Sequence, residues 1–255
     1  MKKHLKAKIL KEAFVLIVAS SFIIANQVDM NGAVNSNFGN SYGFYDFSEN
    51  ILDLNIFYND LQGWIQYEYS NPPDIGFGNN DIRKFRLEYS TGDFILKLGD
   101  LYEFWGRGLL LNQFDDQVTN FDNGTRGLLI EYDGGSFSAS HMNGNSSIWN
   151  MGADTRTPEY NNIHSMMANR LEYNRGLIAL GLTQLRSNEE HDVNFGPSVL
   201  VNHDLKGAYA TWSGGNADLF VEYVDKVSTE KVTMFGTIPN DTLLKGHGYY
   251  QNFNF

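Results

Sequence analysis

Residues 84–98 read Lys84-Phe85-Arg86-Leu87-Glu88-Tyr89-Ser90-Thr91-Gly92-Asp93-Phe94-Ile95-Leu96-Lys97-Leu98. Up to Tyr89, charged residues alternate with apolar or aromatic ones, and an alternation resumes after Asp93. Successive side chains of a strand point to opposite faces, so the pattern predicts two strands, each with one apolar and one charged face. Between them, Thr91-Gly92-Asp93 is a turn signal, so we expect a hairpin.

The first of these two strands ends in an apolar residue, then Glu, then Tyr, and this three-residue pattern, with an apolar or aromatic first residue, occurs five times in the chain. Each Glu faces away from its neighbours. In a soluble sheet the apolar face would lie in a core. In a membrane barrel it would face lipid, with Tyr at the headgroups and Glu in a wet lumen. The copies are Tyr67-Glu68-Tyr69, Leu87-Glu88-Tyr89, Ile130-Glu131-Tyr132, Leu171-Glu172-Tyr173 and Val221-Glu222-Tyr223.

Alternating runs fill most of residues 26–255 and are separated by two kinds of connection. Short turns such as Asp133-Gly134-Gly135 often follow a Glu-Tyr copy, whereas long polar stretches such as 144–162 fall on the other side. That asymmetry is typical of outer-membrane barrels. We therefore predict an all-β fold, an antiparallel transmembrane β-barrel of about 10–12 strands, which forms one domain or part of a larger barrel. The predicted interfacial girdle on one rim is Tyr69, Tyr89, Tyr132, Tyr173 and Tyr223.

The N-terminus predicts export. Five lysines in the first eleven residues precede the apolar run Ala13–Ala25, which is typical of a signal peptide and short for a membrane-spanning helix. We expect residues 1–25 to be a signal peptide with an uncertain cleavage site, and an uncleaved helical anchor is the alternative. The chain has no cysteine, which excludes a lipidated N-terminus and fits a bacterial envelope protein.

The net charge of the chain limits the kinds of partner that it can bind. Of 19 basic and 30 acidic residues, residues 1–25 hold five and one, which leaves 14 basic and 29 acidic residues, a formal charge of −15. Nucleic acid is an unfavourable partner for so acidic a chain. We expect outer-membrane lipid and other envelope proteins as partners, and no small-molecule ligand can be named.

The alternation fails over residues 99–127. Gly106 and Gly108 flank Arg107 and allow unusual backbone conformations, as in a loop that folds into a lumen. Three interpretations are open: a structural salt-bridge network, a selectivity constriction or ligand site, and a divalent cation held by three aspartates, whose spacing matches no EF-hand. The predicted site residues are Glu103, Arg107, Asp115, Asp116, Asp122 and Arg126, with the cation assigned to Asp115, Asp116 and Asp122.

This segment resembles an uncharacterised outer-membrane β-barrel family that is common in Bacteroidota. The resemblance rests on G-D-x-Y-E-x-x-G-R-G-L-x-L at residues 99–111, followed by Asp115-Asp116 and by D-N-x-x-R-G at residues 122–127. It implies an envelope location and a barrel fold, and no activity. Members of that family are longer, so a C-terminally truncated barrel is one expectation; the aromatic end at Phe255, similar to the terminal signal of outer-membrane proteins, favours a complete one.

Motif searches give no catalytic residue, no metal ligand set and no cofactor site. We therefore expect a non-enzymatic bacterial outer-membrane protein, with porin-like passage or a structural role in an envelope complex. Two alternatives are an exported soluble β-sandwich that binds carbohydrate through Trp149 and Trp212, and a hydrolase carried on a barrel.

Overall fold

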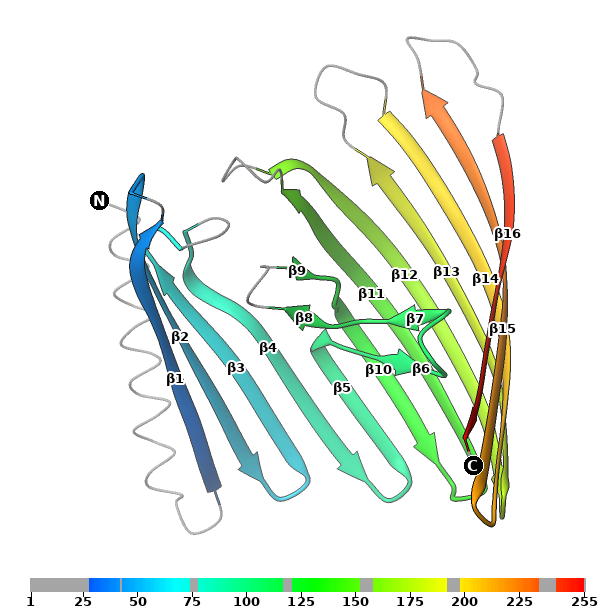
Figure 1. The fold of residues 1–255 in the computed structure, drawn as a ribbon. Coiled ribbons are helices and arrows are strands. Elements are labelled where there is room, and N and C mark those ends of the chain that lie inside the picture. Colours follow the sequence, from blue (N-terminus) through cyan, green and yellow to red (C-terminus); the bar gives the residue numbers. More distant parts are fainter. Residues whose placement is uncertain are drawn as a thin grey trace.

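The computed structural model describes residues 28–41, 43–73, 78–116, 121–151, 158–191, 198–233 and 242–254. The predicted signal peptide, residues 1–25, lies outside these ranges. Twelve strands form one antiparallel sheet in chain order, and four short strands form two small hairpins (Figure 1). The long strands are β1 (Val28–Ser41), β2 (Tyr45–Tyr58), β3 (Leu61–Ser70), β4 (Asn80–Thr91), β5 (Phe94–Leu101), β10 (Thr125–Asp133), β11 (Phe137–Met151), β12 (Pro158–Arg175), β13 (Ile178–His191), β14 (Ser198–Gly214), β15 (Ala217–Thr233) and β16 (Thr242–Asn254).

This architecture confirms the predicted fold class, at the upper end of the predicted strand number. It contradicts the β-sandwich alternative, because all long strands of the described ranges belong to one sheet rather than to two packed layers. Within those ranges β1 and β16 each pair with a single neighbour, so the sheet is not closed on itself. The described part of the chain contains no helix of the length and apolarity that a membrane crossing requires.

Five tight turns lie on the same rim of the sheet, where β2, β4, β10, β12 and β14 end. Four of them hold a glycine with positive φ, a conformation that is unfavourable for a residue with a Cβ atom: Gly92 at 54°, Gly135 at 81°, Gly176 at 62° and Gly215 at 62°. Four longer connections lie on the opposite rim, after β3, β11, β13 and β15. The predicted asymmetry of short turns and long loops is therefore present.

The outer face of the sheet is apolar next to the short turns and polar farther away. On β13 the exposed outer residues are Ile178, Leu180 and Leu182, the last 62% exposed, and Gln184 and Arg186 follow. The same change occurs on β14, β15, β10 and β5, where three apolar or small outer residues are followed by a charged one. The outer face of the sheet therefore carries an apolar band in the part nearest the short turns.

The predicted tyrosine girdle does not lie at a single level of the sheet. Tyr89, Tyr132 and Tyr173 lie within the last three residues of their strands, at the short turns. Tyr69 is the penultimate residue of β3, at the opposite rim, and Tyr223 lies inside β15, which continues to Thr233. The prediction of one common rim is therefore wrong for Tyr69 and Tyr223, because the Glu-Tyr ending recurs in strands of different length and direction.

The five glutamates of these endings face the other side of the sheet, and each has a partner there. Glu68 and Glu222 are buried, and the others are half-buried. Charged side chains on this face are therefore paired rather than bathed in bulk water. The partners are Arg83 for Glu68, Arg86 for Glu88, Lys97 for Glu131, Tyr209 for Glu172 and the backbone N–H of Arg107 for Glu222.

Strands β5 and β10 are shorter than their neighbours. β5 pairs with β4 only over Arg86–Thr91, and β10 pairs with β11 only as far as Asn145. Between Leu101 and Thr125 the chain leaves the sheet and runs across its inner face (Figure 1). We call Tyr102–Gly124 the inward segment.

The sheet curves around the inward segment. Seven neighbour-to-neighbour steps separate β4 from β15 in the strand order. On a flat sheet this is about 34 Å at the usual strand spacing. One short segment nevertheless contacts both Lys84 of β4 and Glu222 of β15. The inner face is therefore concave, as Figure 1 shows.

Three glycines lie side by side where the inward segment departs. Gly99, Gly127 and Gly144 are register partners on β5, β10 and β11. A Cβ atom on Gly127 would lie 2.1 Å from the backbone oxygen of Asn143, so these strands approach too closely for a side chain.

We expect Gly127→Ala to destabilise the sheet by about 1–3 kcal/mol, because the backbone of β11 would have to move. The measurement is the temperature at which refolded protein loses its heat-modifiable migration on gels. Gly246→Ala in β16 is the matched control, since a Cβ atom there would meet no atom within 4 Å. Equal midpoints for the two variants would show that the close approach at Gly127 is not required.

Candidate functional site: the inward segment

The inward segment contains two short hairpins. One pairs β6 (Phe104–Trp105) with β7 (Leu111–Asn112), and the other pairs β8 (Asp115–Asp116) with β9 (Phe121–Asp122). Residues 117–120 lie outside the described ranges. The first hairpin extends towards β15, and the second lies between β4 and β11 (Figure 1).

An apolar contact holds the first hairpin on the concave face. Trp105 is fully buried in a cluster that includes Leu129, Met142 and Val224 of three different strands. Its indole N–H donates to Glu103 Oε2 at 3.3 Å, and the Arg170 guanidinium lies 5.5 Å from its ring. Full burial of one large apolar side chain contributes about 1.5–3 kcal/mol, so Trp105 anchors the segment.

The tip of this hairpin is attached to β15. Gly106 and Gly108 have φ of 63° and 83°, and their tight turn directs backbone N–H groups at one carboxylate. The Arg107 N–H donates to Glu222 Oε2 at 2.7 Å, and the N–H of Leu109 is a second donor. A Cβ atom at Gly106 would lie 2.6 Å from Glu222 Oε1, so this approach requires glycine.

Arg107 itself differs from its predicted role. Its guanidinium lies 5.1 Å from the ring of Phe220 on β15, and its backbone N–H, not its side chain, binds the carboxylate. The predicted pairing of the Arg107 side chain with Glu103, Asp115, Asp116 or Asp122 is therefore wrong. The turn at the two glycines carries Arg107 away from β8 and β9, to the far side of the concave face.

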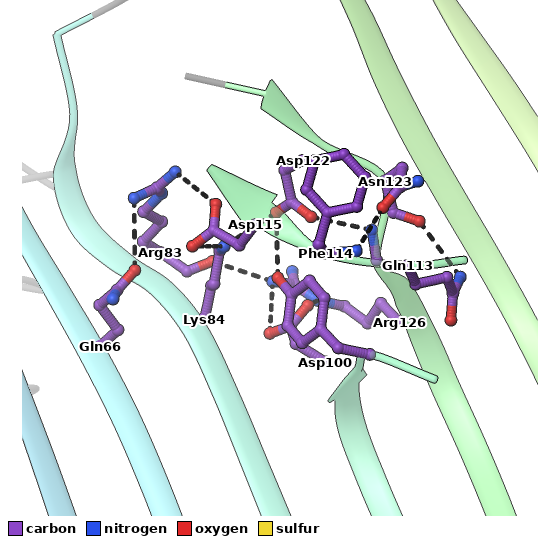
Figure 2. A network of polar contacts seen from close by, with 12 residues as sticks. Gln66, Arg83, Lys84, Asp100, Gln113, Phe114, Asp115, Asp122, Asn123 and Arg126 are labelled. Carbon is purple, nitrogen blue, oxygen red and sulfur yellow. Dashed lines mark hydrogen bonds and ion pairs between the residues drawn. The ribbon is translucent and has the colours of Figure 1, made fainter. Parts of the chain in front are cut away.

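The second hairpin is held by two consecutive cations of β4 (Figure 2). Lys84 Nζ lies 2.5 Å from Asp115 Oδ2 and 3.0 Å from Asp122 Oδ2, and Arg83 Nη2 lies 3.3 Å from Asp115 Oδ1. Asp115 and Asp122 are register partners, so both carboxylates face the same lysine. The Lys84 side chain is 2% exposed, so the cation of this ion-paired cluster is buried, whereas its partner Asp122 is 35% exposed.

A β-bulge explains how two neighbouring residues reach the same face. Gln66 pairs with Lys84 and Tyr67 with Ile82, so Arg83 is an extra residue in the ladder. Without the bulge, alternation would direct Arg83 to the outer face. With it, Arg83 contacts both Glu68 and Asp115 on the concave side.

Tyr102 completes the ion-paired cluster. Its hydroxyl donates to Asp122 Oδ2 at 3.1 Å, and Lys84 Nζ lies 5.1 Å from its ring. Burial, together with the charge of Asp122, raises the pKa of the Tyr102 phenol well above its ordinary value. The hydroxyl therefore remains protonated, and remains a donor, throughout the physiological pH range.

Asp116 follows Asp115 in β8 and pairs in register with Phe121. Asp115 and Asp122 meet Lys84 instead of converging with Asp116 on a common point. Over the ranges that the structure describes, no group of three or more His, Asp or Glu side chains is arranged to hold a metal ion.

Glu103 joins a second group of alternating charges. Lys97 Nζ lies 3.4 Å from Glu103 Oε1 and 3.0 Å from Glu131 Oε2, and Arg170 Nη2 lies 3.7 Å from Glu131 Oε1. These side chains come from the inward segment and from β5, β10 and β12. The concave face therefore presents cations and anions in close succession beneath the segment.

Arg126 lies on the opposite face from the other predicted residues. It shares the outer side of β10 with Leu128, Ile130 and Tyr132, and its guanidinium lies 5.4 Å from the Phe85 ring. Its Nε and Nη2 donate to the two oxygens of Asp100 at 2.9 and 3.0 Å. The prediction that Arg126 belongs to a lumen network is therefore wrong.

Asp100 and Arg126 instead replace missing ladder bonds. On the N-terminal side of Arg86, the residues of β4 have no register partner on β5. The N–H of Phe85 donates to Asp100 Oδ2 at 2.8 Å, and Arg126 Nη2 donates to the carbonyl oxygen of Arg83 at 3.0 Å. Unpaired backbone groups are costly, so this pair supports the sheet where the chain departs.

Sequence reasoning missed Arg83, Lys84, Asp100 and Glu222 as members of the site. Glu222 and Lys84 did belong to strand patterns that the sequence placed on a polar face, which was the available signal. Their partners lie in the inward segment, and no local pattern relates residues 115 positions apart, as Glu222 and Arg107 are.

No protein-family model and no curated protein matches this chain. Among solved structures it is similar to outer-membrane expressed OmpT of Vibrio cholerae, with 13% identity over 89% of this chain and 81% of that one and a TM-score of 0.47. It is also similar to a triple mutant of Rhodopseudomonas blastica porin, with 11% identity over 88% of this chain and 100% of that one and a TM-score of 0.26. Likenesses this distant carry no argument, so the fold assignment rests on the strand pairing described above.

Lys84→Met should lower the free energy of unfolding by about 3–5 kcal/mol, because two aspartates would lose their buried partner. The measurement is urea unfolding of the refolded protein, followed by tryptophan fluorescence. Lys206→Met removes an exposed lysine 3.6 Å from Asp204 and should change the same free energy by less than about 0.5 kcal/mol. A similarly small effect at Lys84 would mean that the cluster does not hold the hairpin.

Glu222→Ala should release the tip of the first hairpin, because two backbone N–H groups would lose their acceptor. We expect trypsin then to cleave after Arg107 at least tenfold faster than in the unaltered protein, as followed by mass spectrometry of the fragments. The control, Glu88→Ala, removes another concave-face glutamate, whose partner is Arg86 of the same strand. Resistance of Arg107 to cleavage in the Glu222 variant would show that Trp105 alone fixes the tip.

Proposed function

We propose that this chain is a bacterial outer-membrane β-barrel protein whose inward segment forms a charged constriction for small polar solutes. The observation that carries the proposal is the division between the two faces of the sheet. The outer face has an apolar band, whereas the concave face is lined with paired charges and crossed by the inward segment.

The apolar band supports a lipid environment. Side chains such as Leu180, Leu182, Leu98 and Phe94 are half or more exposed in the structure. Soluble proteins rarely expose an apolar surface of this extent to water. Lipid would cover it, with the short turns on the periplasmic side and the long loops outside. The polar outer residues of β13 and β14 then extend beyond the bilayer.

The inward segment supports a role in selection. It is fixed at both ends, by Lys84 and Arg83 at β4 and by Glu222 at β15. A constriction needs such rigidity, because a mobile loop would not hold charges at defined positions. Asp115, Asp122 and Glu103 of the segment are ion-paired with cations of the sheet, so a solute that passes alongside the segment would meet charges of both signs at fixed positions.

Passage of a solute past the inward segment requires no catalytic group. A purely structural role in an envelope complex would use the same fold. A measurement of conductance distinguishes that role from the passage of solutes.

We expect refolded, heat-modifiable protein to give single-channel steps in a planar lipid bilayer. The double variant Asp115→Asn with Asp122→Asn should shift permeability towards anions by a factor of two or more, since Lys84 and Arg83 keep their charge. Asp225→Asn, an exposed position on β15, is the control and should leave selectivity unchanged. Absence of any conductance would contradict passage and leave the structural role; unchanged selectivity in the double variant would contradict the constriction.

A further inference from the structure

Four polar side chains form a continuous row on the concave face, away from the inward segment. His164 of β12, Glu189 of β13, His203 of β14 and Ser228 of β15 lie on strands that are neighbours in the sheet (Figure 1). His164 and Glu189 are register partners, and so are His203 and Ser228. Neither the salt-bridge clusters nor the proposed constriction uses this row.

The contacts within the row have a defined order. The Ser228 hydroxyl lies 2.7 Å from His203 Nδ1, and His203 Nε2 lies 3.2 Å from Glu189 Oε2. A neutral imidazole with its proton on Nε2 donates to the carboxylate and accepts from the hydroxyl. His164 Nε2 lies 3.6 Å from the other oxygen, Glu189 Oε1. Glu189 therefore lies between the two imidazoles and fixes the tautomer of His203.

The environment of Ser228 differs from that of three other buried serines on this face. Ser70 donates to Glu68 and Ser140 to Glu131, and Ser146 donates to a backbone carbonyl. None of those three acceptors is a neutral base that can take and return a proton at physiological pH. Ser228 is bonded to an imidazole that is itself held by a carboxylate, which is the arrangement that activates a serine hydroxyl.

We propose that Ser228, His203 and Glu189 form a nucleophile, base and orienting carboxylate that hydrolyse soluble carboxylic esters. This activity goes beyond the proposed passage role and does not depend on it. Ser228 is 5% exposed, and the side chains of His203 and His164 are 15% and 19% exposed, so the imidazoles are the more accessible part of the row.

The chemistry balances within these groups. Ser228 Oγ attacks the ester carbonyl carbon while its proton moves to His203 Nδ1. The C–O bond to the alcohol breaks, and the leaving oxygen takes that proton. Water then attacks the acyl-serine, gives a proton to Nδ1, and the carboxylic acid departs as Oγ regains the proton. Glu189 stays ionised and stabilises the transient imidazolium.

The position of the row indicates how substrate would arrive. Along β15, Ser228 is six residues beyond Glu222, about 20 Å at the rise of an extended strand. That direction leads away from the short turns and the apolar band, towards the rim with the long connections. An ester dissolved in water on that side would reach the row without crossing the inward segment.

The test is covalent labelling of the full-length, refolded protein with a fluorophosphonate probe, read by mass spectrometry. We expect one label on Ser228, none in Ser228→Ala, and a labelling rate at least 100-fold lower in His203→Gln. Ser140→Ala is the matched control and should label as fast as the unaltered protein. Hydrolysis of p-nitrophenyl acetate should follow the same order among the variants.

Heat-modifiable migration of each variant establishes that it is folded. An unlabelled Ser228 in folded protein would overturn the proposal, and so would a label on Ser228 whose rate is the same in His203→Gln. Because labelling needs no bilayer, these outcomes are independent of the conductance experiment. Loss of conductance with labelling intact would reject the passage role alone.

Discussion

The ion pairs of Lys84 are the interaction on which the inner arrangement of this protein depends. An almost fully buried ammonium group is tolerated only when carboxylates surround it. Asp115 and Asp122 supply them from two strands of one small hairpin, and Tyr102 binds the second aspartate. The cluster fixes the hairpin beside β4, where β5 and β10 are too short to continue the sheet. The first hairpin has its own attachments, through the buried Trp105 and through Glu222 of β15.

Alternation predicted the faces of the strands correctly because period two is a property of the backbone and needs no knowledge of partners. Lys84, Arg86 and Glu88 share the concave side, as the sequence indicated. The same rule would have placed Arg126 on the outer side with Leu128 and Ile130. The sequence prediction places Arg126 in the lumen because it treats residues 99–127 as a break in the alternation, whereas β10 begins at Thr125.

Other features were beyond the reach of the sequence for physical reasons. The bulge at Arg83 inserts one residue into a ladder and reverses the expected face, and nothing in the residue types requires it. The contact of Glu222 with the turn at Gly106 joins segments that only the curvature of the sheet brings together. The glycines flanking Arg107 signalled an unusual turn, but they did not reveal that backbone N–H groups, rather than the guanidinium, would bind a carboxylate.

The attachment of the hairpin tip to β15 has a consequence for the order of folding. The cluster at Lys84 joins residues fewer than 40 positions apart, so it can form once β4 and the second hairpin exist. The bond to Glu222 spans 115 positions and must wait until β15 lies in the sheet. The inward segment is thus held first at one end and closed last at the other. Until β15 joins the sheet, the tip of the first hairpin has no carboxylate to bind. The concave face of the sheet stays exposed to solvent during that time.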